Sequence, residues 1–311
     1  MYNFSYISGR SPRGVWKNST MLMRYNTSTL SFEKCQSIPV AREGFQLVSG
    51  PRDTIFVVGG KTLLEHFDSD RLSHVPSTKI HQYNAKFNHW ELLRYDSKTT
   101  IFDEATSPCF IIMNCLIAIG QFGKISCIDI NKNYISKRSV STERARESLL
   151  GKLCSTQVRS IAVITQLRPD SLPDDADVVF VLVDLARVVK QHREQEHTNL
   201  PDAEVQSSNA DKTVVVPRSE FSFNGNRCYI IALCTCGDKL LVLTRMGDGD
   251  IALFNCNADD FVDGTSPQWQ FSARQSSKSI GFPVMKVEYA KLFCMKSSLK
   301  TANNYDLGLT I

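Results

Sequence analysis

The chain has 311 residues, of which 42% are hydrophobic and 22% are charged, and these values exclude wholesale disorder and a fibrous repeat. Its formal net charge of +4 is small, and Lys and Arg form no concentrated stripe in either half, so we expect no nucleic-acid partner. No window approaches the ~20 apolar residues that cross a bilayer, and residues 1–5 lack the basic and apolar parts of a signal peptide. The sequence therefore predicts a cytoplasmic protein without a membrane partner.

Short apolar runs rich in β-branched residues recur along the chain. They cover residues 54–58, 116–119, 178–183 and 239–243, and each is closed by Gly, Asp or Thr. This pattern suits a strand that is covered on both faces better than it suits a helix. The positions that end such runs are separated by 51, 61, 64 and 60 residues, and they are Ser8, Gly59, Gly120, Asp184 and Thr244. The spacing indicates an internal repeat.

A second regularity lies within each repeat, where one large apolar residue is followed seven positions later by another. Polar, turn-forming residues such as 26–28 and 84–86 separate the members of two of these pairs. Each pair therefore predicts two antiparallel strands around a tight hairpin. The pairs are Tyr25 and Phe32, Tyr83 and Trp90, Ile128 and Ile135, Val216 and Phe223, and Phe254 and Phe261.

Two of the repeats share a distinctive order of residues. An apolar strand, residues 55–58, ends in a double glycine and leads to Tyr83 and Trp90, while the preceding repeat supplies Tyr25, Phe32, Pro39 and Arg42. This order resembles the kelch repeat, in which an apolar strand ends in Gly-Gly and is followed by a Tyr, six further residues, a Trp, and then a Pro and an Arg. Later repeats are degenerate, since Gly120-Gln121 replaces the double glycine and no Trp stands at position 135 or 223. The resemblance covers residues 1–140 by motif and extends to about residue 296 by pattern.

The resemblance implies an all-β fold, namely a kelch-type β-propeller with five or six blades of four antiparallel strands, complete or truncated. On this alignment the units run roughly over 46–95, 108–138, 158–223 and 228–271. Residues 282–287 would close the ring with the N-terminal piece, which removes exposed sheet edges. We expect one domain over residues 1–296 and a C-terminal tail over residues 297–311.

Two polar stretches interrupt the repeats. Residues 138–157 contain a segment that predicts one or two helical turns between blades, and residues 185–212 predict a long polar loop.

The repeat markers are interpreted as structural. Gly59 and Gly60 suit a close backbone approach where the strand leaves the centre of the ring. Tyr83 and Trp90 are expected to pack between neighbouring sheets. Arg42 either anchors an inter-blade connection by hydrogen bonds to carbonyl groups or faces a partner, and the anchor is favoured. Tyr25, Phe32 and Gly120 are the other structural markers.

No residue pattern predicts a metal, a cofactor or a catalytic group. His192 and His197 are five residues apart and would diverge by roughly 140° on a helix, so a solvated loop is favoured over a zinc site. Cys234 and Cys236 are interpreted as core thiols, because most of the ten cysteines lie in apolar runs, as expected in a reducing compartment. Residues 246–250 are interpreted as a glycine-rich hairpin.

In the proteins that the chain resembles, the loop after the double-glycine strand and the loop between blades bind a peptide or a protein degron. Transferred to this sequence, that face is basic and favours an acidic ligand, and it comprises Arg10, Arg13, Lys61, His66 and Arg245.

The resemblance therefore implies a non-enzymatic protein–protein interaction module. It is similar to the substrate-recognition propeller of kelch-like adaptors of cullin-type ubiquitin ligases, and no BTB or BACK region precedes the repeats here. Within a longer protein it would associate with a cullin ligase or with actin. Two alternatives stay open: an actin-binding cytoskeletal scaffold, and a propeller enzyme whose site is built from dispersed residues.

Overall fold

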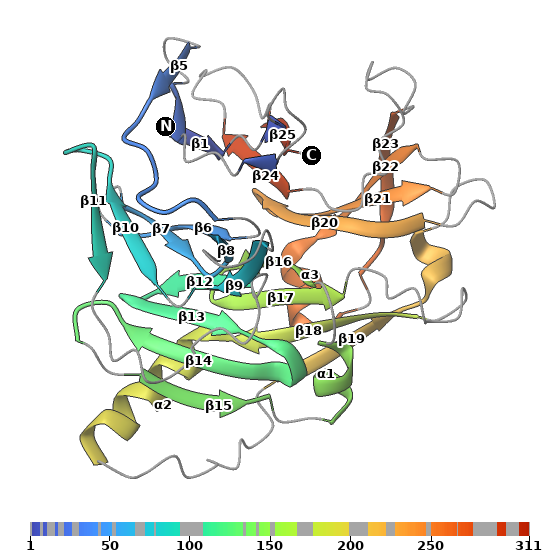
Figure 1. The fold of residues 1–311 in the computed structure, drawn as a ribbon. Helices are drawn as coiled ribbons and strands as arrows, with labels where there is room; N and C mark the ends of the chain where they lie inside the picture. Colours follow the sequence, from blue (N-terminus) through green and yellow to red (C-terminus); the bar gives the residue numbers. More distant parts are fainter. Residues whose placement is uncertain are drawn as a thin grey trace. The chain divides into compact units, whose positions relative to one another are not determined.

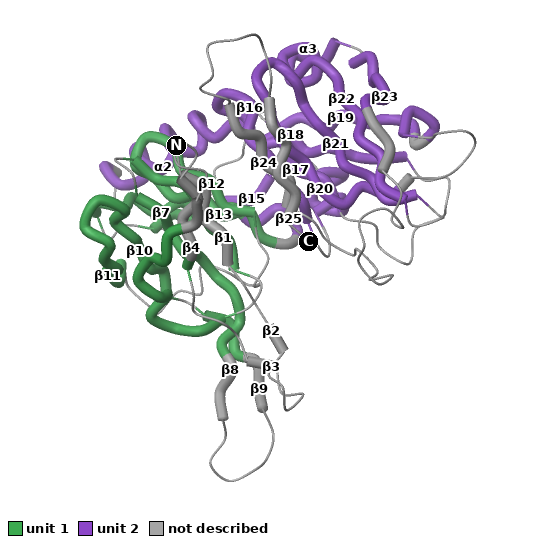
Figure 2. The backbone as a smooth tube through the Cα atoms, turned by 90° about the horizontal axis from the view of Figure 1, so that it is seen from above, with its two compact units in different colours: residues 1–120, 125–137 green, residues 121–124, 138–311 purple. Residues whose placement is uncertain are grey.

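A computed structural model divides the chain into two compact units, and each is described by itself (Figure 2). The first unit comprises residues 1–120 and 125–137, and the second comprises residues 121–124 and 138–311. The structure describes residues 2–6, 9–10, 16–17, 22–26, 31–42, 45–51, 54–65, 72–77, 79–93, 108–132, 135–140, 143–149, 153–166, 177–198, 211–221, 228–246, 250–265, 267–275, 291–296 and 305–310.

The first unit contains two antiparallel sheets of four strands, and in each sheet the strands follow one another in chain order (Figure 1). In the first sheet a β-hairpin is inserted between the second and third strands; it is formed by β8 (Lys61–Glu65) and β9 (Leu72–Pro76). The strands of the first sheet are β6 (Gln46–Ser49), β7 (Thr54–Val58), β10 (Ile80–Asn84) and β11 (His89–Leu93). Those of the second sheet are β12 (Cys109–Ile112), β13 (Cys115–Ile119), β14 (Lys124–Asp129) and β15 (Ile135–Ser139).

The second unit repeats this plan with helices in the connections. The third sheet consists of β16 (Leu153–Val158), β17 (Ile161–Gln166), β18 (Val178–Asp184) and β19 (Lys212–Val216). The fourth consists of β20 (Cys228–Cys236), β21 (Lys239–Met246), β22 (Ile251–Asn257) and β23 (Gln270–Gln275). Helix α1 (Glu143–Ser148) precedes the third sheet, α2 (Leu185–Thr198) joins β18 to β19, and α3 (Ala258–Asp263) joins β22 to β23.

The remaining strands form smaller sheets. A three-stranded sheet contains β1 (Tyr2–Tyr6), β4 (Leu22–Asn26) and β5 (Ser31–Lys34), and β2 (Gly9–Arg10) pairs with β3 (Trp16–Lys17). Near the C-terminus β24 (Lys291–Lys296) pairs with β25 (Tyr305–Thr310). The segment expected to be a tail over residues 297–311 thus contains a paired strand. Short 3-10 turns occur at Gln121–Gly123 and Arg218–Phe221.

The sheets have the strand order of propeller blades, and the first strands of consecutive blades lie next to each other within each unit. In the first unit β6 contacts β12, and in the second unit β16 contacts β20. The hydroxyl groups of Thr156 and Thr235 are 2.9 Å apart across this second contact. The protein is therefore all-β and built of propeller-type blades. The described residues contain four complete blades, so the expected number of five or six is corrected to four.

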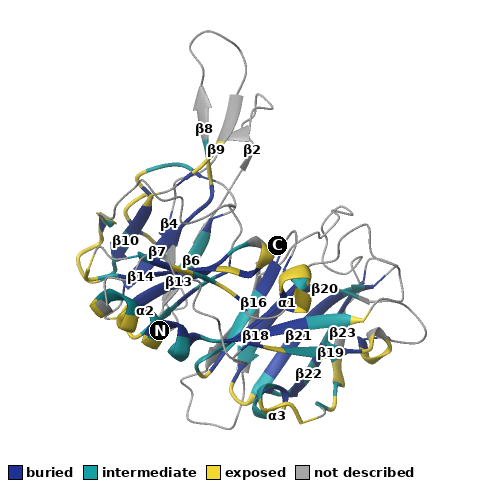
Figure 3. Ribbon diagram, turned by 90° about the horizontal axis from the view of Figure 1, so that it is seen from below, coloured by how far each residue is buried: buried dark blue, intermediate teal, exposed yellow. Residues whose placement is uncertain are grey.

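Burial follows the blade plan, because the second strand of each blade is covered on both faces (Figure 3). In β7 the side chains of Ile55 and Val57 pack towards the segment that contains Cys35, Ile38 and Phe45. The alternate residues Phe56 and Val58 join the core shared with β13 and β14. This two-sided burial explains why each of these strands is a continuous apolar run rather than an alternating one.

The first, second and fourth blades match the units expected from the sequence to within a few residues, the sheet of the third spans residues 153–216 instead of 158–223, and one of the hairpins is corrected. Tyr25 lies opposite Phe32, and Tyr83 lies opposite Trp90, as expected. Phe254 does not pair with Phe261, which lies in α3; its partner in the sheet is Phe271. Val216 ends β19 and is followed by a 3-10 turn, and position 223 lies outside the described residues.

The two polar stretches have different outcomes. The helical turns expected within residues 138–157 are confirmed as α1. The long loop expected over residues 185–212 is wrong for residues 185–198, which form α2, because Leu185, Val188 and Val189 supply a buried face along one side of that helix. Residues 199–210 and the proposed closing segment 282–287 lie outside the described residues. None of the helices in the described part of the chain has the length and apolar character that spanning a membrane requires.

Candidate binding site

Arg42 is fully buried in the first unit and holds the connection between the second and third strands of the first blade. Its Nη1 donates to the carbonyl oxygens of Gly59 at 3.0 Å and Lys79 at 2.8 Å. Its Nη2 donates to Nδ1 of His81 at 2.7 Å. A guanidinium group supplies several donors in a fixed plane, and one side chain can thus fix two separate pieces of backbone. The expectation that Arg42 is an anchor is confirmed.

His81 accepts this hydrogen bond only when its Nδ1 carries no proton. Burial, the positive charge of Arg42 and that of Lys79 lower the pKa of His81 from 6.5 to about 4. The imidazole is therefore neutral at pH 7, with its proton on Nε2, and it acts as an acceptor in the anchor.

The double glycine leads out of this anchor. Gly59 and Gly60 are buried and have φ values of 67° and 85°, which are in the left-handed region that favours glycine. The positive φ at both residues explains why glycine stands at these positions. The chain then enters β8 at Lys61, which is exposed. One predicted binding residue therefore begins a connection whose base is rigidly held.

Tyr83 and Trp90 fix the other side of the first blade, as expected. Their rings pack with centroids 5.0 Å apart, and both are buried. The Trp90 indole donates to the carbonyl oxygen of Gln36 at 2.9 Å, and the Tyr83 hydroxyl donates to Oδ1 of Asn88 at 2.8 Å. The aromatic pair thus ties the outer hairpin of the first blade to the segment that follows β5.

The predicted binding residues that the structure describes lie in both units, so they are not tested as one face. Arg10 lies in β2, with its side chain outside the description, and Arg13 and His66 lie outside the described residues. Lys61 is exposed in the first unit. Arg245 is half-buried on β21 of the second unit, opposite Tyr229 and Ile251. Of the other markers, Tyr25 and Phe32 are strand partners and Gly120 directly follows β13.

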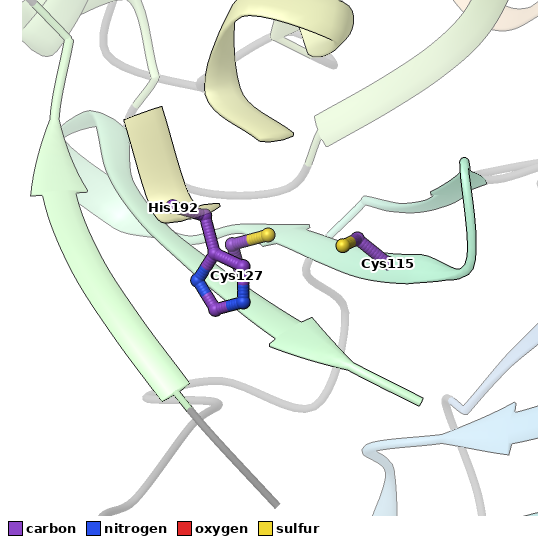
Figure 4. Close-up of side chains that lie close together, drawn as sticks. All are labelled: Cys115, Cys127 and His192. Carbon is purple, nitrogen blue, oxygen red and sulfur yellow. The ribbon is translucent and has the colours of Figure 1, made fainter. Parts of the chain in front are cut away.

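The cysteines pack mainly as core residues. Cys115 on β13 and Cys127 on β14 come from neighbouring strands of the second blade, are buried, and form no disulfide bond (Figure 4). Burial raises the pKa of Cys256 to about 12 and also raises the pKa of Cys154, which keeps both thiols protonated and unreactive.

Two further sequence interpretations are changed by the structure. Cys236 is disulfide-bonded, unlike Cys234, so the expected pair of core thiols is wrong for Cys236. His192 is buried in α2 and His197 is exposed, which places them on different faces of a helix rather than in a solvated loop. The expected hairpin at residues 246–250 is confirmed, since the Met246 N–H donates to the Asp250 carbonyl at 2.7 Å.

A pocket with a volume of about 460 Å³ opens in the second unit. One wall is the start of β19, Lys212–Val215, together with Leu182 at the end of β18. The other wall is formed by Val262 at the end of α3 and by Gly264, Thr265 and Pro267 in the connection that follows. This volume lies within the range of ligand-binding cavities.

One wall is formed by β18 and β19, the third and fourth strands of the third blade, and the other belongs to the connection between the third and fourth strands of the fourth blade. Successive strands run in opposite directions, so this connection lies at the other end of a blade from the connection between the second and third strands. Arg245 lies near the latter, at the end of β21 and opposite the first residue of β22, whereas α3 follows the end of β22. Arg245 therefore lies away from the pocket, and none of the described residues among the five predicted ones lines it. Sequence reasoning missed it because its lining residues carry no motif, although the Thr-Val-Val-Val run at residues 213–216 is a strand signal.

A scan against protein-family models finds no matching family, and no curated protein matches the chain. The propeller-type blades are thus established by the structure, and the kelch assignment stays a prediction from residues 1–140.

Proposed function

We propose that the chain is a non-enzymatic protein-interaction module whose role resembles that of the substrate-recognition propellers of kelch-like adaptors. Loops carried on a rigid scaffold are where recognition residues concentrate, and propeller blades are such a scaffold. The observation that carries the proposal is the Arg42 anchor, which fixes both ends of the connection that begins at the exposed Lys61.

The proposed partner is a protein or peptide with acidic residues. Lys61 offers an exposed cation, and Arg10, Arg13, His66 and Arg245 are the other basic positions assigned to the same role. Each exposed ion pair contributes about 0–1 kcal/mol, so several acting together are needed for measurable affinity. Within a longer protein, such a module would present its ligand to a cullin-type ligase or to actin filaments.

Co-precipitation from a cell lysate tests the proposal. The wild-type chain is compared with a triple variant, Arg10→Glu, Arg13→Glu and Lys61→Glu, and with a matched variant that reverses three exposed charges elsewhere, Lys137→Glu, Arg144→Glu and Lys190→Glu. We expect defined partner proteins to be lost with the first variant and retained with the second. Identical partners for all three chains would show that the basic face does not bind, and recovery of no partner by the wild-type chain would contradict an interaction module.

The same proposal implies that the chain turns over no substrate. A hydrolase and oxidase screen on the purified chain, together with elemental analysis for bound metals, tests this. A positive result in either would support the propeller-enzyme alternative instead.

A further inference from the structure

We infer that the pocket of the second unit and the adjoining free edge of β19 bind an extended segment of a partner protein, in which an apolar side chain stands next to an acidic one. This inference rests on the proposed function and names a second binding site for it, which none of the described residues of the predicted basic face lines.

The edge of β19 is the first element of this site. β19 is the last strand of its sheet and, among the described residues, pairs only with β18. In an antiparallel pair, alternate residues turn their N–H and C=O groups away from the neighbouring strand. Alternate residues of Lys212–Val216 therefore present backbone donors and acceptors at the sheet edge. An extended chain satisfies such groups by adding one more strand.

The second element is a firm opposite wall. Asn257 caps the start of α3 by accepting hydrogen bonds from the N–H groups of Asp259 and Asp260 at 2.9 and 3.1 Å. At the other end, the Thr265 hydroxyl donates to the Asp260 carbonyl at 2.8 Å, next to Gly264 with a φ of 81°. Both ends of this short helix are thus fixed.

Aromatic packing ties this wall to the third blade. The rings of Phe261 in α3 and Phe180 in β18 meet edge to face with centroids 5.1 Å apart, and both are fully buried. Trp269 packs on Phe261 with a centroid separation of 5.8 Å. The pocket is therefore formed before a ligand arrives, which lowers the entropic cost of binding.

The lining specifies the chemistry of the occupant. Val214, Val215 and Val262 are half-buried and offer apolar surface to one side chain of the added strand. Of the described lining residues, Lys212 is the only one with a charged side chain, and it is exposed at the mouth. A carboxylate next to the apolar residue would pair with it. An extended acidic and apolar peptide fits all three features: edge, pocket and cation.

A lysine on an edge strand also discourages sheets from pairing edge to edge. If Lys212 served only to prevent edge-to-edge pairing, another charged residue at this position would serve equally well, and the affinity for the peptide would not change. The two roles therefore predict different results for Lys212→Glu.

The test uses fluorescence anisotropy with the full chain and a labelled probe peptide, acetyl-Thr-Val-Glu-Val-Asp-Val-Thr-amide. Two further probes carry N-methyl groups on alternate residues, in the two possible phases. In an added strand, only every second residue directs its backbone N–H group towards β19. N-methylation of those residues should therefore lower the affinity at least about tenfold, whereas N-methylation of the residues between them should leave it equal to that of the parent probe. Equal affinity for both phases, or no saturable binding of the parent probe, would overturn the inference.

Charge provides the second readout. Lys212→Glu should weaken the parent probe at least about tenfold, and a probe with Lys in place of both acids should regain affinity for this variant. Lys190→Glu is the matched control, because Lys190 is an exposed residue of α2 in the same unit and does not line the pocket. An equal effect of the two variants would contradict a specific site. Light scattering that shows dimers of the wild-type chain, with no probe binding, would assign the β19 edge to a second copy and reject the peptide.

The result is distinguishable from that of the proposed function. If the probes fail while the wild-type chain still recovers partners that depend on the basic face, only this second site is wrong. If neither the probes nor partner proteins bind, the interaction module itself is contradicted.

Discussion

The Arg42 anchor gives the sharpest stability prediction. Arg42→Met keeps much of the apolar stem but removes three hydrogen-bond donations, to Gly59, Lys79 and His81. A hydrogen bond from a charged donor contributes about 1.5–3 kcal/mol net, and the lower value is appropriate because the substitution also removes the cost of burying the charge. Three such bonds amount to about 4 kcal/mol, a large part of the ~5–15 kcal/mol that stabilises a typical domain.

Hydrogen exchange measured by mass spectrometry is the suitable assay, since it reports on the first unit separately. In peptides that contain residues 54–60 and 80–84, a loss of about 4 kcal/mol should raise the exchange rates of the protected amides about a thousandfold. Arg144→Met is the control, because Arg144 is exposed on α1 and its loss should change exchange little. If Arg42→Met alters exchange in these peptides by less than about fivefold, Arg42 is not an anchor.

Three further predictions concern single groups. The pKa of His81 is about 4 in the folded chain and 6.5 in the unfolded chain, so the unfolded chain binds more protons between these pH values. The free energy of unfolding should therefore fall by up to about 3 kcal/mol as the pH falls from 6.5 to 4. Urea midpoints across this range measure the effect, and His81→Gln should flatten the dependence; an unchanged slope would refute it. Asp211→Asn should destabilise the second unit by about 3 kcal/mol, because the largely buried Arg138, which lies 3.4 Å from the Asp211 carboxylate, loses that charged partner. Thermal melts measure the effect, with Asp263→Asn at an exposed residue as the control. Equal melting temperatures of the two variants would argue against the ion pair. Thiol titration of the denatured, unreduced chain should find at most eight of its ten cysteines reactive, because Cys236 is disulfide-bonded, and ten would contradict the bond.

Much of the fold could be predicted because its signals are local. The continuous apolar run of β7 reports burial on both faces, and the Tyr83 and Trp90 spacing reports a hairpin whose partners lie opposite each other. Arg42 could be singled out by its place in the repeat, after Pro39, and its guanidinium donates to the carbonyl oxygens of Gly59 and Lys79.

The failures arise where the pattern is set by distant contacts. Phe261 has the spacing of a hairpin partner, yet the Asn257 cap starts a helix there and the core of the third and fourth blades takes up its ring. The α2 segment looks polar as a whole, and four buried residues on one side, three of them apolar, make it a packed helix. The pocket depends on β19 and on the connection after α3, which lie about 50 residues apart in the chain, and no local motif marks such a juxtaposition.

Photo-crosslinking tests the proposed binding role most directly. A benzophenone amino acid is placed in turn at Lys61, at Thr265 beside the pocket, and at the exposed Arg144, and each chain is irradiated in a cell lysate. We predict discrete protein adducts from positions 61 and 265 and none from position 144, with the adduct at 265 suppressed by the acidic probe peptide. Absence of adducts at both positions, or the same adducts at all three, would contradict the account.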